Sequence, residues 1–198
     1  MVTTFIFDIG NVVWNYQDLL GRLLEKWASL SGLPLEEFKN HYLAYYKFFE
    51  TNEKTLDDFV LSLNQSDPLP YYQALSDIYR EEEFNKYLNQ PLLRLINNLR
   101  SVIKVGYLSN AENFYYPHIH QRIKSNFDFG YCSWELGLEK PNPEIFQKVL
   151  SLENIKPSEI IFIDDTEINI KPAQSLGINT ILYQNNQQLL SELRQISL

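Results

Sequence analysis

Five short apolar runs recur along the chain, each rich in β-branched or aromatic residues. Such runs predict buried strands, because a strand covered on both faces loses the polar alternation of an exposed one. The predicted strands cover residues 2–7, 101–110, 129–134, 159–165 and 179–183. Helical spacing of apolar positions separates and follows the later runs, over residues 91–99, a segment starting at Ala111, 143–152, 169–177 and 187–196. This alternation predicts an α/β fold with a doubly wound parallel sheet.

The segment between the first two strands has no convincing strand pattern and carries several helical ones instead. These patterns cover residues 19–30, 35–49, 56–63 and 70–84. Turn residues of the Ser, Gly, Pro, Asn and Asp type lie between them. We therefore expect an all-helical cap domain, residues 17–87, inserted above the carboxyl edge of a core domain formed by residues 1–16 and 88–198.

Composition and charge limit the classes of molecule that the protein is expected to bind. The chain has 198 residues, of which 44% are hydrophobic and 14% aromatic, so it can bury a sizeable core. Its formal charge of −8 argues against a nucleic-acid partner, since such proteins carry clustered basic surface. A small phosphate ester is compatible with this charge, because nearby lysines, metal ions and helix termini set the field at a site.

Cysteine content and hydropathy bear on the compartment. The single cysteine, Cys132, excludes an internal disulfide and is typical of a reducing compartment. The sequence shows neither a secretory signal pattern nor a run of about 18 apolar residues. We therefore expect a cytoplasmic protein with no membrane partner.

Polar residues stand at the ends of three of the predicted strands. They are Asp8 after the first run, Ser109 and Asn110 after the second, and Asp164 with Asp165 after the fourth. The carboxyl ends of parallel strands meet at one edge of a sheet, where open α/β folds build their sites. Each residue also has an ordinary interpretation, since Asp ends many turns and Ser or Asn caps many helices.

A fourth motif, GLEKPNP, carries Lys140 between a glycine and two prolines. A proline restricts the residue before it to extended backbone, which suits a lysine that aims its ammonium group inward. Taken alone, a lysine is more often a solvated surface group. Adjacent carboxylates such as Asp164 and Asp165 repel each other unless a cation lies near them, and an oxygen-rich set suits Mg²⁺.

In order and spacing, the stretches FDIGN, GYLSN, GLEKPNP and FIDD resemble the four signature motifs of the haloacid dehalogenase-like superfamily. The likeness is nearest to its small helical cap subfamily, which includes α-D-glucose-1-phosphate phosphatases. It implies a Rossmann-like core and an Mg²⁺-dependent phosphatase that acts on a small phosphorylated metabolite, with a sugar phosphate such as glucose 1-phosphate as the best candidate.

The resemblance also implies a role for each residue. Asp8 would be the nucleophile that forms a phosphoaspartate, and Lys140 would neutralise the nucleophile and the phosphoryl oxygens. Substrate phosphate would be bound by Ser109, Asn110 and Lys140. The Mg²⁺ ligands would be Asp8, the backbone carbonyl of Gly10, Asp165 directly, and Asp164 either directly or through water.

Gly10 departs from the superfamily pattern, in which an aspartate two residues after the nucleophile protonates the leaving alcohol. Such general acid–base help is worth about 10²–10⁴-fold in rate. A leaving group of low pKa needs less help, and a substrate group, a cap residue or water can replace the carboxylate.

Two other functions stay open at this point. A metal-independent 2-haloacid dehalogenase also uses an aspartate nucleophile and lacks the second aspartate, although it leaves the Asp164–Asp165 pair unexplained. A non-catalytic phosphate-binding module would have lost turnover with that aspartate. An aromatic cluster at 42–49 fits packing within the insert better than a pocket, for which Trp14 is the better candidate.

Overall fold

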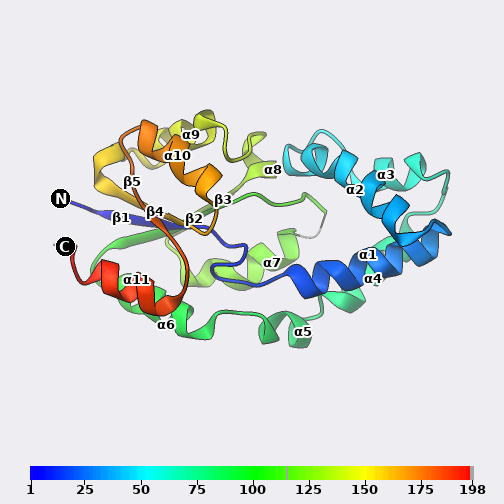
Figure 1. The fold of residues 1–198 in the computed structure, drawn as a ribbon, viewed down its shortest axis with the longest axis horizontal. Coiled ribbons are helices and arrows are strands. Elements are labelled where there is room, and N and C mark those ends of the chain that lie inside the picture. The colour runs from blue at the N-terminus through cyan, green and yellow to red at the C-terminus, as the bar shows by residue number, and fades with distance from the viewer. Residues whose placement is uncertain (115, 197–198) are drawn as a thin grey trace.

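A computed structural model of the chain describes residues 1–114 and 116–196 (Figure 1). One parallel sheet contains its strands in the order β3-β2-β1-β4-β5. The strands are β1 (Thr4–Phe7), β2 (Lys104–Ser109), β3 (Phe129–Cys132), β4 (Ile160–Asp164) and β5 (Asn179–Leu182). Helices lie on both faces of this sheet, so the predicted doubly wound α/β fold is confirmed.

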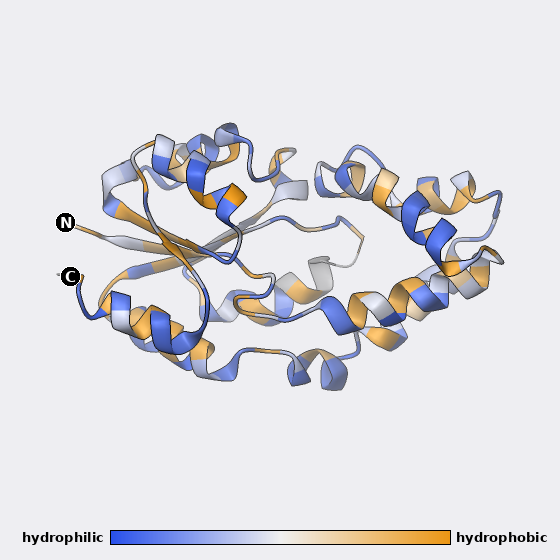
Figure 2. Cartoon of the chain, viewed as in Figure 1, coloured by the Kyte–Doolittle hydropathy of each residue, from blue (hydrophilic) through white to orange (hydrophobic). Residues whose placement is uncertain are grey.

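Alternate residues of the strands face two separate apolar cores. Ile6 and Phe162 pack with α9 (Pro143–Glu153) and α10 (Glu167–Ser175) on one face. Phe5 and Phe7 face the other side, in the larger core. That face is covered by α6 (Gln90–Leu99), α7 (Tyr116–Ile123) and α11 (Asn186–Leu193). Figure 2 shows hydrophobic residues along the strands, and helices on which hydrophobic and hydrophilic residues alternate.

The strand register brings the motif residues to one level of the sheet. Phe7 pairs with Tyr107 on one side and with Ile163 on the other. Asp8 and Asp164 each follow one residue later, on adjacent strands. The chain leaves β1 toward β2 and leaves β4 toward β5, on opposite sides, so these two residues lie at the topological switch point where such sheets bind ligands.

The helices of the insert gather at the end of the molecule beyond the carboxyl ends of the strands (Figure 1). Its four longer helices are α1 (Gln17–Ser31), α2 (Leu35–Glu50), α3 (Leu56–Ser62) and α4 (Leu69–Ile78). They pack around the buried Trp27, whose indole N–H donates to the carbonyl of Tyr71 at 3.0 Å.

The helix predicted over 70–84 divides in two. Helix α4 ends at Ile78, Arg80 takes an extended backbone, and α5 (Glu81–Lys86) follows. Three consecutive glutamates open α5, and acidic side chains stabilise a helix N-terminus through its dipole. The apolar periodicity continues across the break, which is why the sequence pattern alone does not reveal it.

Two boundaries after the second strand also differ from the sequence prediction. The helix expected from Ala111 begins at Tyr116, because the Ala111 backbone instead pairs with the Ser133 hydroxyl. The third strand ends at Cys132 rather than at residue 134, because Glu135 accepts a hydrogen bond from the Cys132 backbone and starts a short helix, α8 (Ser133–Leu136).

The two segments that join the insert to the sheet run side by side. Trp14 and Leu88 form an antiparallel bridge, and Asn89 donates to the carbonyl of Val13 at 2.8 Å. This pairing lets the helices enter after β1 and return before α6 without disturbing the sheet. Within residues 1–114 and 116–196, no helix combines the length and apolar content needed to cross a bilayer.

Candidate active site

Asp8 stands at the entrance of a tight loop that follows β1. Its backbone N–H donates to the carbonyl of Ile163 at 2.8 Å, which extends the pairing of the central strands by one residue. Asn11 takes a left-handed backbone with φ of 56° as the loop turns. The Asp8 side chain is nearly buried, yet it lines the cavity that this loop encloses.

Lys140 joins two of the predicted carboxylates in a buried cluster. Its Nζ lies 2.7 Å from Asp8 Oδ1 and 2.7 Å from Asp164 Oδ2. Burial alone would lower the pKa of Lys140, but the two carboxylates outweigh it and hold that pKa above its ordinary value. The lysine therefore carries its charge into the site, beside the candidate nucleophile.

Asp164 is held by donors on both carboxylate oxygens. The Thr166 backbone donates to Oδ1 at 2.8 Å, and the Asn169 amide lies 3.1 Å from each oxygen. With Lys140 added, this fully buried carboxylate is largely satisfied by the protein itself. Asn169 was not predicted from the sequence, although its place at the start of α10, five residues after Asp164, could have indicated it.

Asn110 holds the loop that carries Lys140. Its side chain accepts from the Lys140 backbone N–H at 2.8 Å and donates to the Lys140 carbonyl at 2.8 Å. Its amide is therefore engaged in positioning Lys140. Ser109 is buried at the end of β2 and lines the cavity, where its hydroxyl donates to the Asn110 carbonyl at 3.2 Å.

Three acidic side chains meet at the floor of the cavity. Oxygens of Asp8, Asp164 and Asp165 all lie within 4.8 Å of one another. Burial raises the pKa of Asp8 to about 7, and repulsion from Asp164 and Asp165 adds to this shift against the attraction of Lys140. One lysine does not balance three carboxylates, so the donor set fits a hard divalent cation such as Mg²⁺.

The space beside Gly10 is occupied by another side chain. A Cβ atom added at Gly10 would lie 3.1 Å from Cε1 of Tyr16 and 3.8 Å from Oδ2 of Asp8. The ring of Tyr16 therefore stands where the side chain of an aspartate at position 10 would begin. Tyr16 was not predicted as a site residue, because nothing in the local pattern shows that it folds back over the loop.

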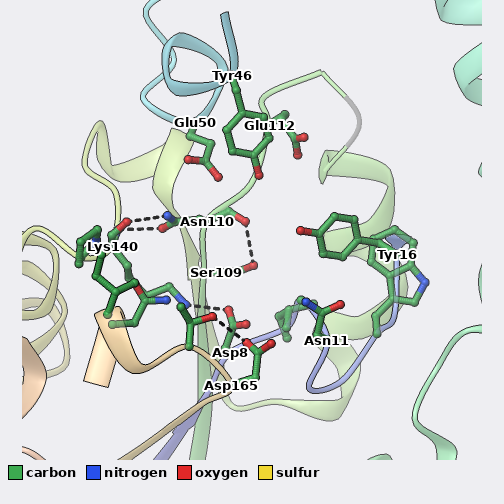
Figure 3. A pocket seen from close by; sticks show the side chains of 17 residues that line it. Asp8, Asn11, Tyr16, Tyr46, Glu50, Ser109, Asn110, Glu112, Lys140 and Asp165 are labelled. Atoms are coloured by element: carbon green, nitrogen blue, oxygen red, sulfur yellow. Dashed lines mark hydrogen bonds and ion pairs between the residues drawn. The ribbon is translucent and has the colours of Figure 1, made fainter. Parts of the chain in front are cut away.

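The cavity above Asp8 has a volume of about 290 Å³ and a polar roof. Figure 3 shows Tyr46 and Glu50 of α2, together with Glu112, on the side opposite Asp8 and Asp165. Burial and then repulsion from Glu112 raise the pKa of Glu50 to about 9, and a hydrogen bond to Glu139 contributes to the rise. Glu50 therefore holds a proton at neutral pH.

The roof residues come from the aromatic segment of the insert and from the loop after β2. Tyr42 and Phe49 are buried in the core of the insert, as expected for packing residues. Tyr46 of the same segment lines the cavity, and so does Trp14, the expected pocket residue. Glu50 and Glu112 were missed, because neither lies in a motif or near the nucleophile in sequence.

The chain matches the model of the haloacid dehalogenase-like hydrolases over residues 2–177. It belongs to this family. The predicted enzyme class, a haloacid dehalogenase-like hydrolase, is thereby confirmed, and the site described above lies where the strands of the family fold end.

Relatives and solved structures resemble this hydrolase to different extents. It is 26% identical to D-ribitol-5-phosphate phosphatase of Bacteroides thetaiotaomicron over 210 residues, covering 99% of this chain and 98% of that protein. It is 27% identical to bifunctional epoxide hydrolase 2 of Rattus norvegicus over 136 residues, or 65% of this chain, and the matched region is only 24% of that relative.

A solved family enzyme from Bacteroides thetaiotaomicron, an Asp-to-Ala mutant in complex with magnesium and inorganic phosphate, shares the fold. Its TM-score is 0.77 at 24% identity, with 96% of this chain and 99% of that chain covered.

Proposed function

We propose that this hydrolase is an Mg²⁺-dependent phosphatase that cleaves a small phosphate monoester through a phosphoaspartate on Asp8. One observation carries the proposal: Asp8 shares its buried ammonium partner, Lys140, with a second carboxylate at the floor of a substrate-sized cavity. The D-ribitol-5-phosphate phosphatase relative, similar along nearly its whole length, supports the same reaction class.

The first step places Asp8 in line with the leaving oxygen. One Asp8 oxygen attacks phosphorus, while the ammonium group of Lys140 neutralises charge on the nucleophile and on the equatorial phosphoryl oxygens. Ser109 offers a hydroxyl from the cavity wall. Asp164 and Asn110 keep Lys140 in place from its side chain and its backbone, respectively.

The acidic floor is the proposed metal site. Asp8, Asp165 and Asp164 supply carboxylate oxygens, and the backbone carbonyl of Gly10 is the fourth protein ligand that we propose. When bound there, Mg²⁺ supplies positive charge beside the nucleophile and the phosphoryl group. Asp165 is only half-buried, and most of its oxygen lone pairs are available to a metal ion. Asp164 instead accepts hydrogen bonds from Lys140, Thr166 and Asn169.

The cavity favours a small, hydroxylated leaving group, and we propose a sugar or polyol phosphate as substrate. About 290 Å³ accommodates a group of that size. The roof carries carboxyl and phenol groups, which hydrogen-bond hydroxyls. Glucose 1-phosphate stays a candidate because an anomeric hydroxyl leaves easily, and ribitol 5-phosphate joins it because of the relative that acts on it.

The direct test is phosphate release from a panel of sugar phosphates, polyol phosphates, nucleotides and p-nitrophenyl phosphate, with Mg²⁺ and with EDTA. We expect release that depends on the metal and disappears in Asp8→Asn, while Asp77→Asn, an exposed change on α4, leaves it unaltered.

Other outcomes would point to the alternative functions. Binding of phosphate without turnover of any ester would favour a binding module. Halide release from 2-chloropropionate without metal would favour a dehalogenase.

A further inference from the structure

Gly10 leaves the nucleophile loop without a carboxyl group that can protonate a leaving alcohol. We propose that Glu50, delivered by helix α2, gives this proton to the leaving oxygen and then takes one from the hydrolytic water. The inference rests on the proposed phosphatase function and names the group that completes it.

The position of Glu50 fits the geometry of in-line transfer. In such a transfer the leaving oxygen points away from the attacking oxygen, and Asp8 attacks from the cavity floor. The oxygen that departs is therefore directed toward the roof. Glu50 is the last residue of α2, is only 4% exposed, and lines that roof opposite Asp8 (Figure 3).

Contacts with the core hold Glu50 in this position. Glu139, the neighbour of Lys140 in sequence, interacts with the Glu50 carboxyl group and helps to raise its pKa. Lys47, one turn earlier on α2, lies 3.4 Å from the same Glu139 carboxylate. The end of α2, where Glu50 lies, is thus joined to the loop that carries Lys140, the partner of Asp8.

The surroundings of Glu50 keep it protonated before the reaction. The titratable groups that face it are Glu112 after β2, Glu139 before Lys140, Tyr46 on its own helix, and Tyr16 from the linker. Burial disfavours its ionised form most, repulsion from Glu112 and Glu139 adds to this against a hydrogen bond from Tyr46, and the balance raises the pKa of Glu50 to about 9. A carboxyl group in this state is a general acid at neutral pH.

The two neighbouring candidates fit the role less well. Glu112 already accepts a hydrogen bond of 2.8 Å from the Tyr42 hydroxyl, which holds its carboxyl group against α2. Burial raises the pKa of Tyr16 to about 12, so this phenol can orient a leaving group but is poorly matched to cycling its proton near neutral pH.

Protons and bonds balance over the two steps. First, Asp8 forms a bond to phosphorus, the bond from phosphorus to the leaving oxygen breaks, and the Glu50 proton moves to that oxygen to give the alcohol. Then water attacks phosphorus, the Asp8–phosphorus bond breaks to restore the carboxylate, and the ionised Glu50 takes the water proton. The products are the alcohol and inorganic phosphate, and Glu50 ends as it began.

Leaving-group dependence tests the assignment. kcat/KM is measured with Mg²⁺ for p-nitrophenyl phosphate and for the alkyl phosphate that the wild type hydrolyses best, in wild type, Glu50→Gln and Glu50→Asp. We expect Glu50→Gln to lose about 10²-fold or more on the alkyl ester and less than about threefold on the nitrophenyl ester, whose leaving group departs without a proton. Glu50→Asp should recover part of the loss.

The pH profile gives a second readout that a purely structural role would not change. Wild-type kcat/KM on the alkyl ester should fall as pH rises through about 9, because Glu50 then loses the proton that it donates. This basic limb should be absent in Glu50→Gln. The matched control is Glu37→Gln, an exposed change in the first turn of α2, which should keep both the rate and the limb.

The outcomes separate the two proposals. If the wild type hydrolyses both esters but Glu50→Gln lowers them equally or not at all, the assignment of Glu50 is overturned and the phosphatase remains. The assignment is also overturned if Glu112→Gln or Tyr16→Phe alone produces the leaving-group dependence. If the wild type releases no phosphate even from p-nitrophenyl phosphate, the phosphatase itself fails and the role of Glu50 fails with it.

Discussion

At the scale of single residues, the centre of the site is an ammonium group buried between two carboxylates. The Lys140 side chain is 2% exposed, and its partners Asp8 and Asp164 are 10% and 0% exposed. Taking three charges out of water is costly, and their mutual attraction offsets the cost only while every partner is present. The cluster is therefore expected to affect stability as well as the proposed catalysis.

Lys140→Met should remove the counter-ion and leave both carboxylates buried. We expect the free energy of unfolding, measured with urea in EDTA, to fall by about 3–5 kcal/mol. Lys148→Met, an exposed change on α9, serves as control and should stay within about 0.5 kcal/mol of wild type. Equal losses in the two variants would contradict the buried ion cluster.

Asp165→Asn probes the proposed metal site without relying on activity. Mg²⁺ that binds only the folded chain should raise the free energy of unfolding by about 2.7 kcal/mol at a hundred times its dissociation constant. The variant loses a charged ligand, so the same Mg²⁺ concentration should stabilise it much less. Thermal midpoints with and without Mg²⁺ check this, and an equal rise in both proteins would exclude Asp165 as a ligand.

At the scale of the elements, strands β2 and β3 fit together because each has a glycine that leaves space for an aromatic ring of the other. A Cβ atom added at Gly130 in β3 would lie 1.9 Å from Cε1 of Tyr107 in β2, and one added at Gly106 would lie 2.3 Å from the Phe129 ring. Each strand thus provides a ring that lies over the glycine of its neighbour. The packing of β2 beside β3 therefore depends on both of these contacts between a ring and a glycine.

Gly130→Ala should destabilise the protein, because neither the Tyr107 ring nor the strand backbone can yield without repacking. We expect the free energy of unfolding to fall by about 1–3 kcal/mol. Gly21→Ala is the matched control, since its Cβ meets nothing within 4 Å in α1, and helix propensity predicts a gain of about 0.5–1 kcal/mol. Chemical denaturation of both variants should show opposite signs.

At the scale of the whole molecule, the insert and the sheet share one hydrophobic core and several polar contacts. The Tyr42 hydroxyl reaches Glu112, and the Asn113 amide donates to the carbonyl of Lys54 at 2.8 Å. Together with Lys47 and Glu139, these contacts join α2 and the segment after it to two loops of the sheet. The protonated Glu50 lies among them, so the stability of the whole chain should depend on its titration.

Glu50 links this stability to pH with a definite sign. Its pKa is about 9 in the folded chain and near the ordinary value of 4.5 when unfolded, so the folded state binds the extra proton. The proton on Glu50 therefore contributes fully to the free energy of unfolding below pH 4.5, and this contribution is lost as pH rises toward 9. Between these pH values, the free energy of unfolding should fall with pH in wild type more than it does in Glu50→Gln. The difference between the two slopes should reach about 1.4 kcal/mol per pH unit. Glu37→Gln should keep the wild-type slope, and parallel slopes in Glu50→Gln and wild type would contradict a protonated Glu50.

Local sequence patterns were sufficient to predict the strands, most of the helices and the family motifs. Five apolar runs predicted five strands, and the polar residues at their ends, such as Asp8 and Asp164, lie together at the switch point. These predictions succeed because local composition indicates which strands are buried, and chain direction determines the edge of the sheet at which their carboxyl ends lie. Helix periodicity likewise predicted most of the helices between β1 and β2, although it missed the break at Arg80 and the late start of the helix at Tyr116, where tertiary contacts of neighbouring residues decide the backbone.

The strand order, the partners of Lys140 and the roof of the cavity depend on the tertiary structure. Lys140 and Asp8 are 132 residues apart, and no local pattern encodes their meeting. Tyr16 and Glu50 belong to ordinary helical or linker sequence, and they become site residues only because the insert folds back over the carboxyl edge. The proton state of Glu50 has the same origin, since burial and the approach of Glu112 and Glu139 exist only in the folded chain.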